Sequence, residues 1–314
     1  MPANQPNNNS QKNSGVLITG GSGIVGRYLT SLLLSEGYKV SVLSRNADHH
    51  REFKVLSWDP ENKIIDPSVF EGIDYIIHLA GANIGEKRWS VNRKKEIISS
   101  RSDSASFLHK AITDSGIHLK AFITASATGY YGSVTSDKIF TEKDPPSKDF
   151  LGTTCRLWEQ GADLFRNIGV RTVKIRTAVV LEKSDSALTK LMKPARYGFV
   201  VRTGNGQQYF PWIHIKDLCN IYLMAIEDPN INGAYNAVAP EHVNHNDFVR
   251  TMALVMNRPV FLPPVPAFIL KAIMGEMSVV ILEGSCVSSE KIIKAGYKFI
   301  FGNLNAALEN VING

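Results

Sequence analysis

Cysteine is scarce in this chain of 314 residues. Only three cysteines are present, at positions 155, 219 and 286, and their spacing includes no Cys-x-x-Cys pair of the kind that binds zinc. Three widely separated cysteines also provide no disulfide framework such as small secreted proteins use. The sequence therefore predicts a reducing compartment such as the cytoplasm, and it predicts no metal site.

Long apolar runs are missing as well. The most apolar stretch, 265–282, is interrupted by Lys271 and Glu276 and is short for a bilayer span. We therefore expect a buried amphipathic helix there and no membrane partner. The first fourteen residues, "MPANQPNNNSQKNS", are polar and lack the apolar core of a secretory signal. Residues 1–14 are accordingly predicted to be a disordered leader.

Blocks of like charge are also absent. The formal net charge is +6, yet no run of basic residues is longer than the pair Lys94-Lys95. A nucleic-acid groove usually concentrates its lysines and arginines on one face or one helix. We interpret the excess as solvated surface and expect a small-molecule substrate and no nucleic-acid partner. The sequence does not fix the oligomeric state.

Glycines, in contrast, cluster near the N-terminus. The apolar run "GVLIT" at 15–19 is followed by "GGSGIVG" at 20–26 and then by a segment of helical pattern. A buried strand that leads through a glycine-rich turn into a helix leaves backbone N–H groups free to bind a pyrophosphate. In that order the three spaced glycines would form the turn, admit the pyrophosphate and pack the helix on the strand. The candidate residues here are Gly20, Gly23, Ile24, Val25 and Gly26.

The end of the next strand, 39–43, bears on which dinucleotide is bound. An acidic residue at that place holds the ribose hydroxyls of NAD, whereas an arginine accommodates the 2′-phosphate of NADP. Arg45 occupies the place in this chain. It predicts NADP, and the alternative is an arginine in a solvent-exposed loop.

Two further strand ends complete the predicted cofactor site. A strand over 54–58 leads into Asp59, whose carboxylate could accept a hydrogen bond from the adenine amine or could only mark a turn with Pro60. A strand over 75–79 leads into small residues that could pass beneath the cofactor. The candidates there are Leu79, Ala80 and Gly81. Strands that alternate with helices predict an α/β fold with a doubly wound parallel Rossmann sheet.

Several motifs taken together resemble one protein superfamily. The segments "TGGSGIVG", "IIHLAG", "ITASATGYYG", "WEQGA", "PWIHIKDL" and "RPVFLPPVPAFILKAIMGEM" are similar to the extended short-chain dehydrogenase/reductases, in the branch labelled nucleoside-diphosphate-sugar epimerase-like. The resemblance runs from about 15 to 308. It implies an NADP-binding Rossmann domain over 15–182 and a smaller substrate domain over 183–314, of which 210–238 packs back on the first.

The resemblance also raises the question of the proton donor. In the superfamily a serine follows the fifth strand, and Ser126 matches it. A Tyr-x-x-x-Lys pair on the next helix supplies the acid or base, because a phenol with a pKa of about 10 is otherwise a poor base at neutral pH. Cys155 and Glu159 stand at those positions. Because a carboxylate raises the pKa of a neighbouring thiol, we expect a structural or positioning role for both.

Other residues are candidates for the missing chemistry. Tyr130 and Tyr131 follow Ser126 and could place a phenol over the nicotinamide, or could form an aromatic packing pair. Gln207 and Trp212 are candidates for substrate binding, although Trp212 lies in a strand-like segment and could belong to the core. The sequence thus predicts an NADP-dependent oxidoreductase or epimerase-like enzyme of a small polar or nucleotide-linked substrate. The alternative is a non-catalytic NADP-binding sensor or assembly protein.

Overall fold

The structure, a computed structural model, describes residues 13–45, 53–184, 187–193, 198 and 200–314. Its largest element is an eight-stranded sheet with the order β12-β8-β6-β5-β1-β2-β3-β4. Every neighbouring pair in this sheet is parallel except the edge pair β3–β4. The strands are β1 (Gly15–Thr19), β2 (Lys39–Ser44), β3 (Lys54–Asp59), β4 (Ile64–Ile65), β5 (Ile73–His78), β6 (Ala121–Ala127), β8 (Arg171–Thr177) and β12 (Gly233–Ala237).

Helices cover both faces of this sheet, which explains its continuous apolar strands. On one face α2 packs against α3, and on the other α1 packs against α5. All five residues of β1 are buried, because the strand lies in the middle of the sheet between the two helical layers. The helices are α1 (Ile24–Ser35), α2 (Val91–Ser115), α3 (Phe150–Asn167) and α5 (Ile215–Glu227). The predicted doubly wound Rossmann sheet is confirmed.

The strand order reverses between β1 and β5, and the carboxyl ends of the parallel strands share one edge of the sheet. In open α/β sheets that edge, at the reversal, is where ligands bind. The sequence predicted the first six parallel strands to within a few residues. It did not predict β12, whose "GAYNA" carries Gly233 and the buried Asn236. This strand nevertheless pairs with β8 along its whole length.

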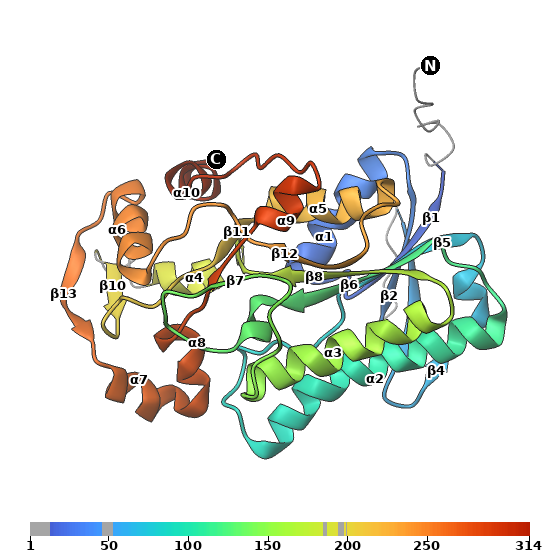
Figure 1. Ribbon diagram of the computed structural model, residues 1–314, viewed down its shortest axis with the longest axis horizontal. Coiled ribbons are helices and arrows are strands. Elements are labelled where there is room, and N and C mark those ends of the chain that lie inside the picture. The colour runs from blue at the N-terminus through green and yellow to red at the C-terminus, as the bar shows by residue number, and fades with distance from the viewer. Residues whose placement is uncertain (1–12, 46–52, 185–186, 194–197, 199) are drawn as a thin grey trace.

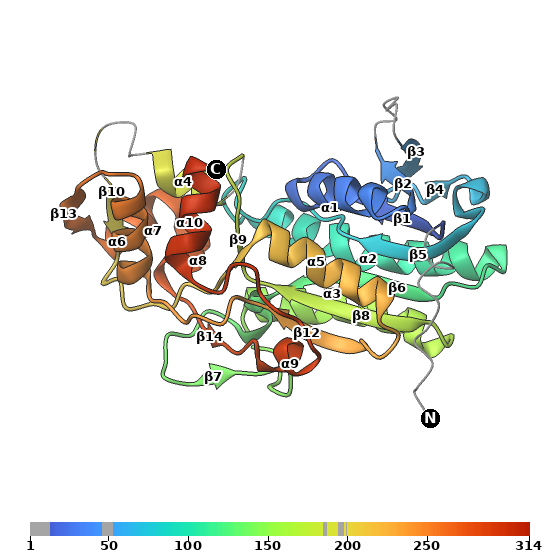
Figure 2. The same ribbon diagram turned by 90° about the horizontal axis from the view of Figure 1, so that it is seen from above.

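The C-terminal part of the chain forms a smaller layer beyond this edge (Figures 1 and 2). Its own core gathers apolar side chains from α6, α10 and β11, with Trp212, Phe248 and Leu308 fully buried. Its helices are α4 (Ala187–Met192), α6 (His245–Val255), α7 (Ala267–Met274), α8 (Val279–Leu282) and α10 (Leu304–Asn313), whereas α9 (Glu290–Lys294) packs beside β12 on the core of the main sheet. Its strand pairs are β10 (Val200–Thr203) with β13 (Val260–Val265), β11 (Trp212–His214) with β9 (Val179–Leu181), and β14 (Cys286–Val287) with β7 (Ile139–Phe140).

One structural prediction was wrong. The stretch 265–282 is not one buried helix but three short pieces, α7, the 3₁₀ turn η4 (Gly275–Ser278) and α8. No side chain of α7 is buried, and Phe268 is 71% exposed. Gly275, with φ of 61°, ends α7 and breaks the helix.

Four other expectations concern a membrane span, a metal site, the cysteines and the N-terminal leader. Within the described residues, no helix has the length and apolar character that crossing a bilayer requires. The same residues contain no group of three or more potential metal ligands. All three cysteines are free and buried. Residues 1–12 of the predicted leader lie outside the part of the chain that the structure describes.

Candidate cofactor and catalytic site

The three spaced glycines of the first turn do different things. Gly20 has φ of 72°, and a Cβ there would lie 2.8 Å from the carbonyl carbon of Leu79. A Cβ at Gly26 would lie 2.5 Å from the Gly20 oxygen, so this glycine lets α1 pack closely on the turn. Gly23 is exposed and caps α1, and a Cβ there would meet only the Gly20 oxygen, at 3.3 Å. The space beyond Gly23 is therefore open to a ligand.

The first turn of α1 presents backbone rather than side chains to that space. Ile24 and Val25 pack their side chains against the core, and no acidic residue stands in the turn. The N–H groups of a helix's first turn have no partner within the helix, and the helix dipole makes this end attractive to anions. An exposed, glycine-lined helix N-terminus at a sheet reversal fits a pyrophosphate.

A hydrogen-bonded chain ties the end of β5 to the end of β1. The Leu79 N–H donates to the Thr19 carbonyl at 3.1 Å, and the Ala80 N–H donates to the Thr19 hydroxyl at 3.2 Å. That hydroxyl lies 2.8 Å from Nδ1 of His78, whose Nε2 lies 3.2 Å from the hydroxyl of Ser104. Burial lowers the pKa of His78 to about 4, so the ring is neutral and links the two hydroxyls without a charge.

The two predicted contacts to the adenosine side of the cofactor lie along the same edge. Arg45 directly follows β2, the neighbour of β1, and is exposed. Asp59 ends β3, but its carboxylate accepts hydrogen bonds from the backbone of Glu61 and Asn62 and from the Asn62 amide. These bonds, chiefly from Asn62, lower the pKa of Asp59. The turn interpretation of Asp59 is realised, while its contact with adenine and that of Arg45 with a phosphate stay predictions.

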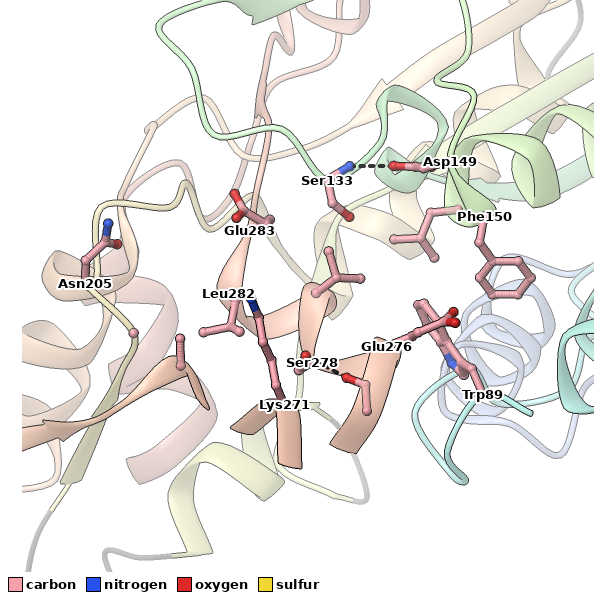
Figure 3. A pocket seen from close by; sticks show the side chains of 15 residues that line it. Trp89, Ser133, Asp149, Phe150, Asn205, Lys271, Glu276, Ser278, Leu282 and Glu283 are labelled. Carbon is pink, nitrogen blue, oxygen red and sulfur yellow. Dashed lines mark hydrogen bonds between the residues drawn. The ribbon is translucent and has the colours of Figure 1, made fainter. Parts of the chain in front are cut away.

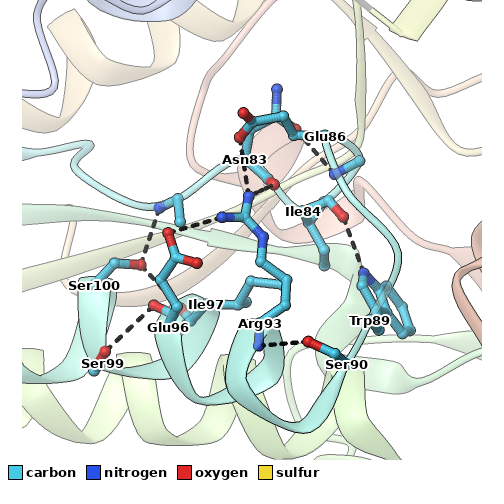
Figure 4. A network of polar contacts seen from close by, with 12 residues as sticks. Asn83, Ile84, Glu86, Trp89, Ser90, Arg93, Glu96, Ile97, Ser99 and Ser100 are labelled. Carbon is cyan, nitrogen blue, oxygen red and sulfur yellow. Dashed lines mark hydrogen bonds and ion pairs between the residues drawn. The ribbon is translucent and has the colours of Figure 1, made fainter.

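The loop after β5 is held rigidly by Arg93 of α2 (Figure 4). The Arg93 guanidinium donates to the Asn83 carbonyl at 2.6 Å and forms ion pairs with Glu86 and Glu96. Within the same loop Trp89 donates to the Ile84 carbonyl at 3.0 Å. Arg93 is only 6% exposed, whereas Glu86 and Glu96 are more than half exposed, so the buried guanidinium links the loop to α2 through carboxylates that reach solvent.

Gly81, at the start of this loop, lies against a second arginine. A Cβ at Gly81 would lie 2.9 Å from the guanidinium carbon of Arg101. Arg101 stacks over the ring of Trp158 on α3, with 4.8 Å from its guanidinium carbon to the ring centre. Leu79, Ala80 and Gly81 thus lie beside the glycine turn, as the sequence predicts, and their contact with a cofactor stays a prediction.

The catalytic side of the edge is a buried ionic network. The Ser126 hydroxyl donates to Glu159 at 2.8 Å, and Arg176 of β8 donates to both oxygens of the same carboxylate, at 2.8 and 3.0 Å. All three side chains are buried. Burial by itself would lower the pKa of Arg176, but the hydrogen bonds and charge of Glu159 raise it above its ordinary value. Ser126 is therefore at the expected strand end, with its proton committed to Glu159.

The two tyrosines of η2 (Thr128–Tyr131) divide into a buried one and a half-buried one. Tyr131 is 2% exposed, and its hydroxyl donates to Asn236 at 2.6 Å and accepts from Arg176 at 2.9 Å. Burial raises its pKa to about 12. Tyr130 is less buried, and its ring stacks on the Arg176 guanidinium at 3.4 Å. Burial raises the pKa of Tyr130 too, against the opposing charge of Arg176. Both phenols therefore keep their protons at neutral pH.

Cys155 is buried beside this network on α3. Burial first, and then the charge of Glu159, raises the pKa of its thiol to about 12. A thiol that holds its proton so firmly is a weak nucleophile. Helix α3, all of which the structure describes, contains neither tyrosine nor lysine. The expected direction of the thiol pKa agrees with the structure.

The sequence did not predict a role for Arg176, which is the partner of Glu159. A signal was available, because β8 carries Lys174 and Arg176 two residues apart, on one face of a central strand. Helix α3 carries Glu159 and Asp163 four residues apart, and the two pairs meet at 2.8 Å each. Charged residues in a strand of a doubly covered sheet need partners. The matching spacing indicated where those partners lie.

The two predicted substrate residues are not on the surface of the main cavity, which lies between the Rossmann sheet's edge and the C-terminal layer. Trp212 is fully buried in the C-terminal core beside Phe248, so it is a packing residue. Gln207 is exposed, and its backbone N–H donates to the Asn205 side chain at 3.0 Å. Asn205 itself lines the cavity. Gln207 therefore lies two residues from a residue of the cavity lining and Trp212 lies in the core, and substrate binding by Gln207 stays a prediction.

Known proteins match this chain along nearly its whole length. The protein YfhF of Bacillus subtilis, an epimerase family protein, is 34% identical over 300 residues, which are 95% of this chain and 97% of that one. The crystal structure of the human epimerase family protein SDR39U1, isoform 2, with NADPH has a TM-score of 0.84 at 30% identity and covers 95% of this chain and 99% of that one. A Thermotoga maritima UDP-glucose 4-epimerase with UDP-glucose shares the fold, with a TM-score of 0.78 at 19% identity over 95% of this chain and 97% of that one.

Two family descriptions divide the chain in sequence. Residues 265–311, which include α7, η4 and α8, match a domain of unknown function, DUF1731. Residues 16–238, which include the glycine turn, the buried network and β12, match the NAD dependent epimerase/dehydratase family. The match over 16–238 covers most of the chain and all of the main sheet except Gly15, and the resemblance to extended short-chain dehydrogenase/reductases is confirmed. This chain belongs to the NAD dependent epimerase/dehydratase family.

Proposed function

We propose that this chain binds NADP(H) and is an oxidoreductase or epimerase-like enzyme. The observation that carries the proposal is the open helix N-terminus at Gly23, next to the strand reversal and beside the loop of Ala80 and Gly81. The human relative, which was solved with NADPH, supports the choice of dinucleotide. Arg45 would bind the 2′-phosphate, because it is an exposed cation that directly follows β2.

Bound NADPH would supply a hydride to a carbonyl group. Among this chain's own residues, Tyr130 is the better proton donor of the two tyrosines. Its ring is half-buried against Arg176, whereas the Tyr131 hydroxyl is already engaged on both sides. The raised pKa of Tyr130 keeps it protonated, which suits an acid and not a base. Glu159 and Arg176 would hold this tyrosine and Ser126 in place.

A second candidate function is a non-catalytic NADP(H) sensor or assembly protein. The observation that favours it is the Glu159–Arg176 ion pair, which fills the region where the family's acid-base pair is expected. A sensor would need the cofactor edge and the C-terminal layer, but no proton donor. The two candidates differ in turnover: an oxidoreductase consumes NADPH, an epimerase converts its substrate and returns the nucleotide, and a sensor does neither.

The test uses the full chain with NADPH and a set of small carbonyl compounds, and it measures both nucleotide binding and loss of NADPH. We expect binding in the wild type and its loss in Gly23→Val, because a side chain there would occupy the pyrophosphate's approach. An oxidoreductase should also consume NADPH, and Tyr130→Phe should slow this by about 100-fold or more while binding persists. An epimerase returns its nucleotide to the starting state, so it is detected by product analysis with NADP⁺ and sugar nucleotides. Binding with neither NADPH consumption nor an epimerised product would select the sensor, and no binding would refute both candidates.

A further inference from the structure

The cavity between the Rossmann sheet's edge and the C-terminal layer has a volume of about 750 Å³ (Figure 3). Trp89 comes from the loop braced by Arg93, and Phe150 and Leu151 come from the start of α3. The opposite wall is formed by α7, η4 and α8, the broken segment 265–282. Leu151 also touches the turn of the two tyrosines, since a Cβ at Gly129 would lie 3.4 Å from it. The cavity therefore adjoins the catalytic side of the site.

Its lining is mostly apolar, and several of its polar groups are already engaged. Asp149 caps α3 and accepts from the backbone of Gly152 at 2.7 Å and of Ser133 at 3.0 Å. The Ser278 hydroxyl donates to the Gly275 carbonyl at 2.7 Å. The apolar side chains on the wall are Trp89, Phe150, Leu151, Ala267, Val279 and Leu282. A ligand here would mainly meet hydrocarbon and aromatic surface.

The charges on the wall have the opposite sign from the chain as a whole. Although the chain carries a formal charge of +6, the described lining holds three carboxylates, those of Asp149, Glu276 and Glu283, and one ammonium, that of Lys271. Glu276 forms an ion pair with Lys94, whose ammonium lies 5.2 Å from the centre of the Phe150 ring, and Glu283 accepts from the hydroxyl of Thr135 at 2.7 Å. Figure 3 shows Lys271 reaching toward Leu282 on this wall.

An anionic diphosphate is badly matched to such a wall. Proteins bind phosphate groups with arginine forks, lysines and free helix N-termini. The N-terminus of α3, which faces this cavity, is already occupied by the Asp149 carboxylate. Among the described lining residues Lys271 is the one cation, and the neighbouring Lys94 is already paired with Glu276, so these residues do not form a clamp for two phosphates.

We propose that this cavity binds an uncharged, largely apolar carbonyl compound of roughly drug size and discriminates against nucleoside diphosphates. Volumes of this order hold such ligands, with a few polar groups that fix their orientation. Here Lys271 and the Asn205 side chain would supply those contacts. In treating the cavity as the substrate site, the inference rests on the proposed function.

The test uses two fluorescent probes that differ by one charge. N-phenyl-1-naphthylamine is neutral, and 1-anilinonaphthalene-8-sulfonate is the same skeleton with an anionic group. Binding of each is measured to the full chain, with and without NADP⁺, and then in competition with UDP-glucose. We expect the neutral probe to bind at least tenfold tighter than the sulfonate and to be unaffected by UDP-glucose. Equal affinities, or displacement by UDP-glucose, would overturn the inference.

Two pairs of variants show that the probes report on this cavity. Val279→Trp should weaken the neutral probe at least tenfold, whereas Val280→Trp, on the same helix but 47% exposed and outside the lining, should not. Glu283→Lys should narrow the gap between the probes to about threefold or less, whereas Glu290→Lys on α9 should leave it unchanged. A variant that behaves like its control would contradict the assignment.

The proposed function can fail separately from this inference. If the wild-type chain does not bind NADP⁺, the dinucleotide proposal is refuted, and the comparison of the two probes is still valid. A normal NADP⁺ affinity with no preference for the neutral probe would refute only the substrate class. The two results therefore report on different parts of the molecule.

Discussion

Two buried polar networks lie under the same edge of the sheet, and they differ in charge. Beneath the cofactor side, Thr19, His78 and Ser104 form a neutral chain. Beneath the catalytic side, Glu159 and Arg176 form an ion pair. A neutral network tolerates the interior as long as its hydrogen bonds are made, whereas a buried charge requires its partner.

The difference shows how the two sides of the site are built. On the cofactor side the surface is backbone and glycine, and the side chains underneath only tie β1 to β5. On the catalytic side the Glu159–Arg176 ion pair orients two neighbours. Glu159 accepts the hydrogen bond of Ser126, and Arg176 stacks on the ring of Tyr130. The cofactor side can therefore accept a charged ligand without competing groups, while the catalytic side holds its side chains in one arrangement. Breaking each network separately tests this contrast.

The largest effect is expected from breaking the ion pair. Glu159→Ala would leave Arg176 buried without its partner, which typically costs about 3–5 kcal/mol in the free energy of unfolding. Urea unfolding of the full chain measures this loss. Replacing both members, by Glu159→Leu with Arg176→Met, should restore much of the stability, because no buried charge then remains.

The exposed pair of Glu290 and Lys294 on α9 provides a control for the same chemistry in water. Glu290→Ala should change the free energy of unfolding little, since exposed ion pairs are screened. If Glu159→Ala lowered the free energy of unfolding as little as Glu290→Ala does, the buried charge of Arg176 would not need Glu159 as its partner. If the double replacement were as damaging as Glu159→Ala, packing and not charge would explain the loss.

The neutral network should respond to acid. The pKa of His78 is about 4 in the folded protein against 6.5 for an ordinary histidine, so below pH 6.5 the unfolded chain binds a proton that the folded chain refuses. The contribution of His78 to the free energy of unfolding is therefore fully present above pH 6.5. It is lost as the pH falls toward 4, by roughly 3 kcal/mol in all.

Comparing the pH dependence of unfolding in the wild type and in His78→Asn isolates this contribution. His214, whose pKa burial also lowers to about 4, remains in the variant, so only part of the dependence should disappear. A variant that keeps the wild-type slope between pH 4 and 6.5 would show that His78 is not held neutral. The comparison of slopes is valid even if the variant is less stable at neutral pH.

The contrast between the two sides also explains what the sequence could predict. The cofactor side depends on local patterns, a buried strand followed by spaced glycines, so Gly20, Gly23 and Gly26 could be assigned from one short segment. The catalytic side depends on contacts between elements. Glu159 and Arg176 are seventeen residues apart in the sequence, and no local pattern predicts that their side chains are in contact. The spacing of the acids on α3 and the bases on β8 was the one available signal.

Burial decided the remaining differences. Trp212 and His214 lie on one face of β11 and Ile213 lies on the other, and all three side chains are buried, so alternation did not separate a binding face from a core face. The segment 265–282 has apolar composition, but Gly275 breaks it, and its partly buried Ala267, Val279 and Leu282 line one wall of a cavity. Composition predicted burial there, whereas backbone geometry determined the outcome.

A smaller effect is expected at the cofactor side from Arg45. A hydrogen bond from a charged group to a phosphate contributes roughly 1.5–3 kcal/mol, so Arg45→Ala should weaken NADPH binding by about tenfold or more and change NADH binding little. Calorimetry with both nucleotides measures the difference. Arg27 serves as a control for discrimination, because its guanidinium donates to the Ser22 carbonyl at 2.8 Å at the N-terminus of α1, so Arg27→Ala should affect NADPH and NADH equally. Equal losses for both nucleotides in Arg45→Ala would remove the assignment to NADP.

The smallest effect is expected from Cys155, and it separates a neighbour of the network from a member of it. Cys155→Ala removes a protonated thiol that the described contacts do not engage in the ion pair, so NADPH binding and any turnover should remain near the wild-type level. Ser126→Ala removes a hydroxyl that donates to Glu159 at a strand end beside Tyr130, so turnover should fall far more. The measurement is kcat and KM for the best carbonyl substrate, together with NADPH affinity. If Cys155→Ala were the more damaging change, the thiol would have a role in the reaction. If both variants kept full turnover, Ser126 would be only a structural donor to the carboxylate, and the proton donor would act without it.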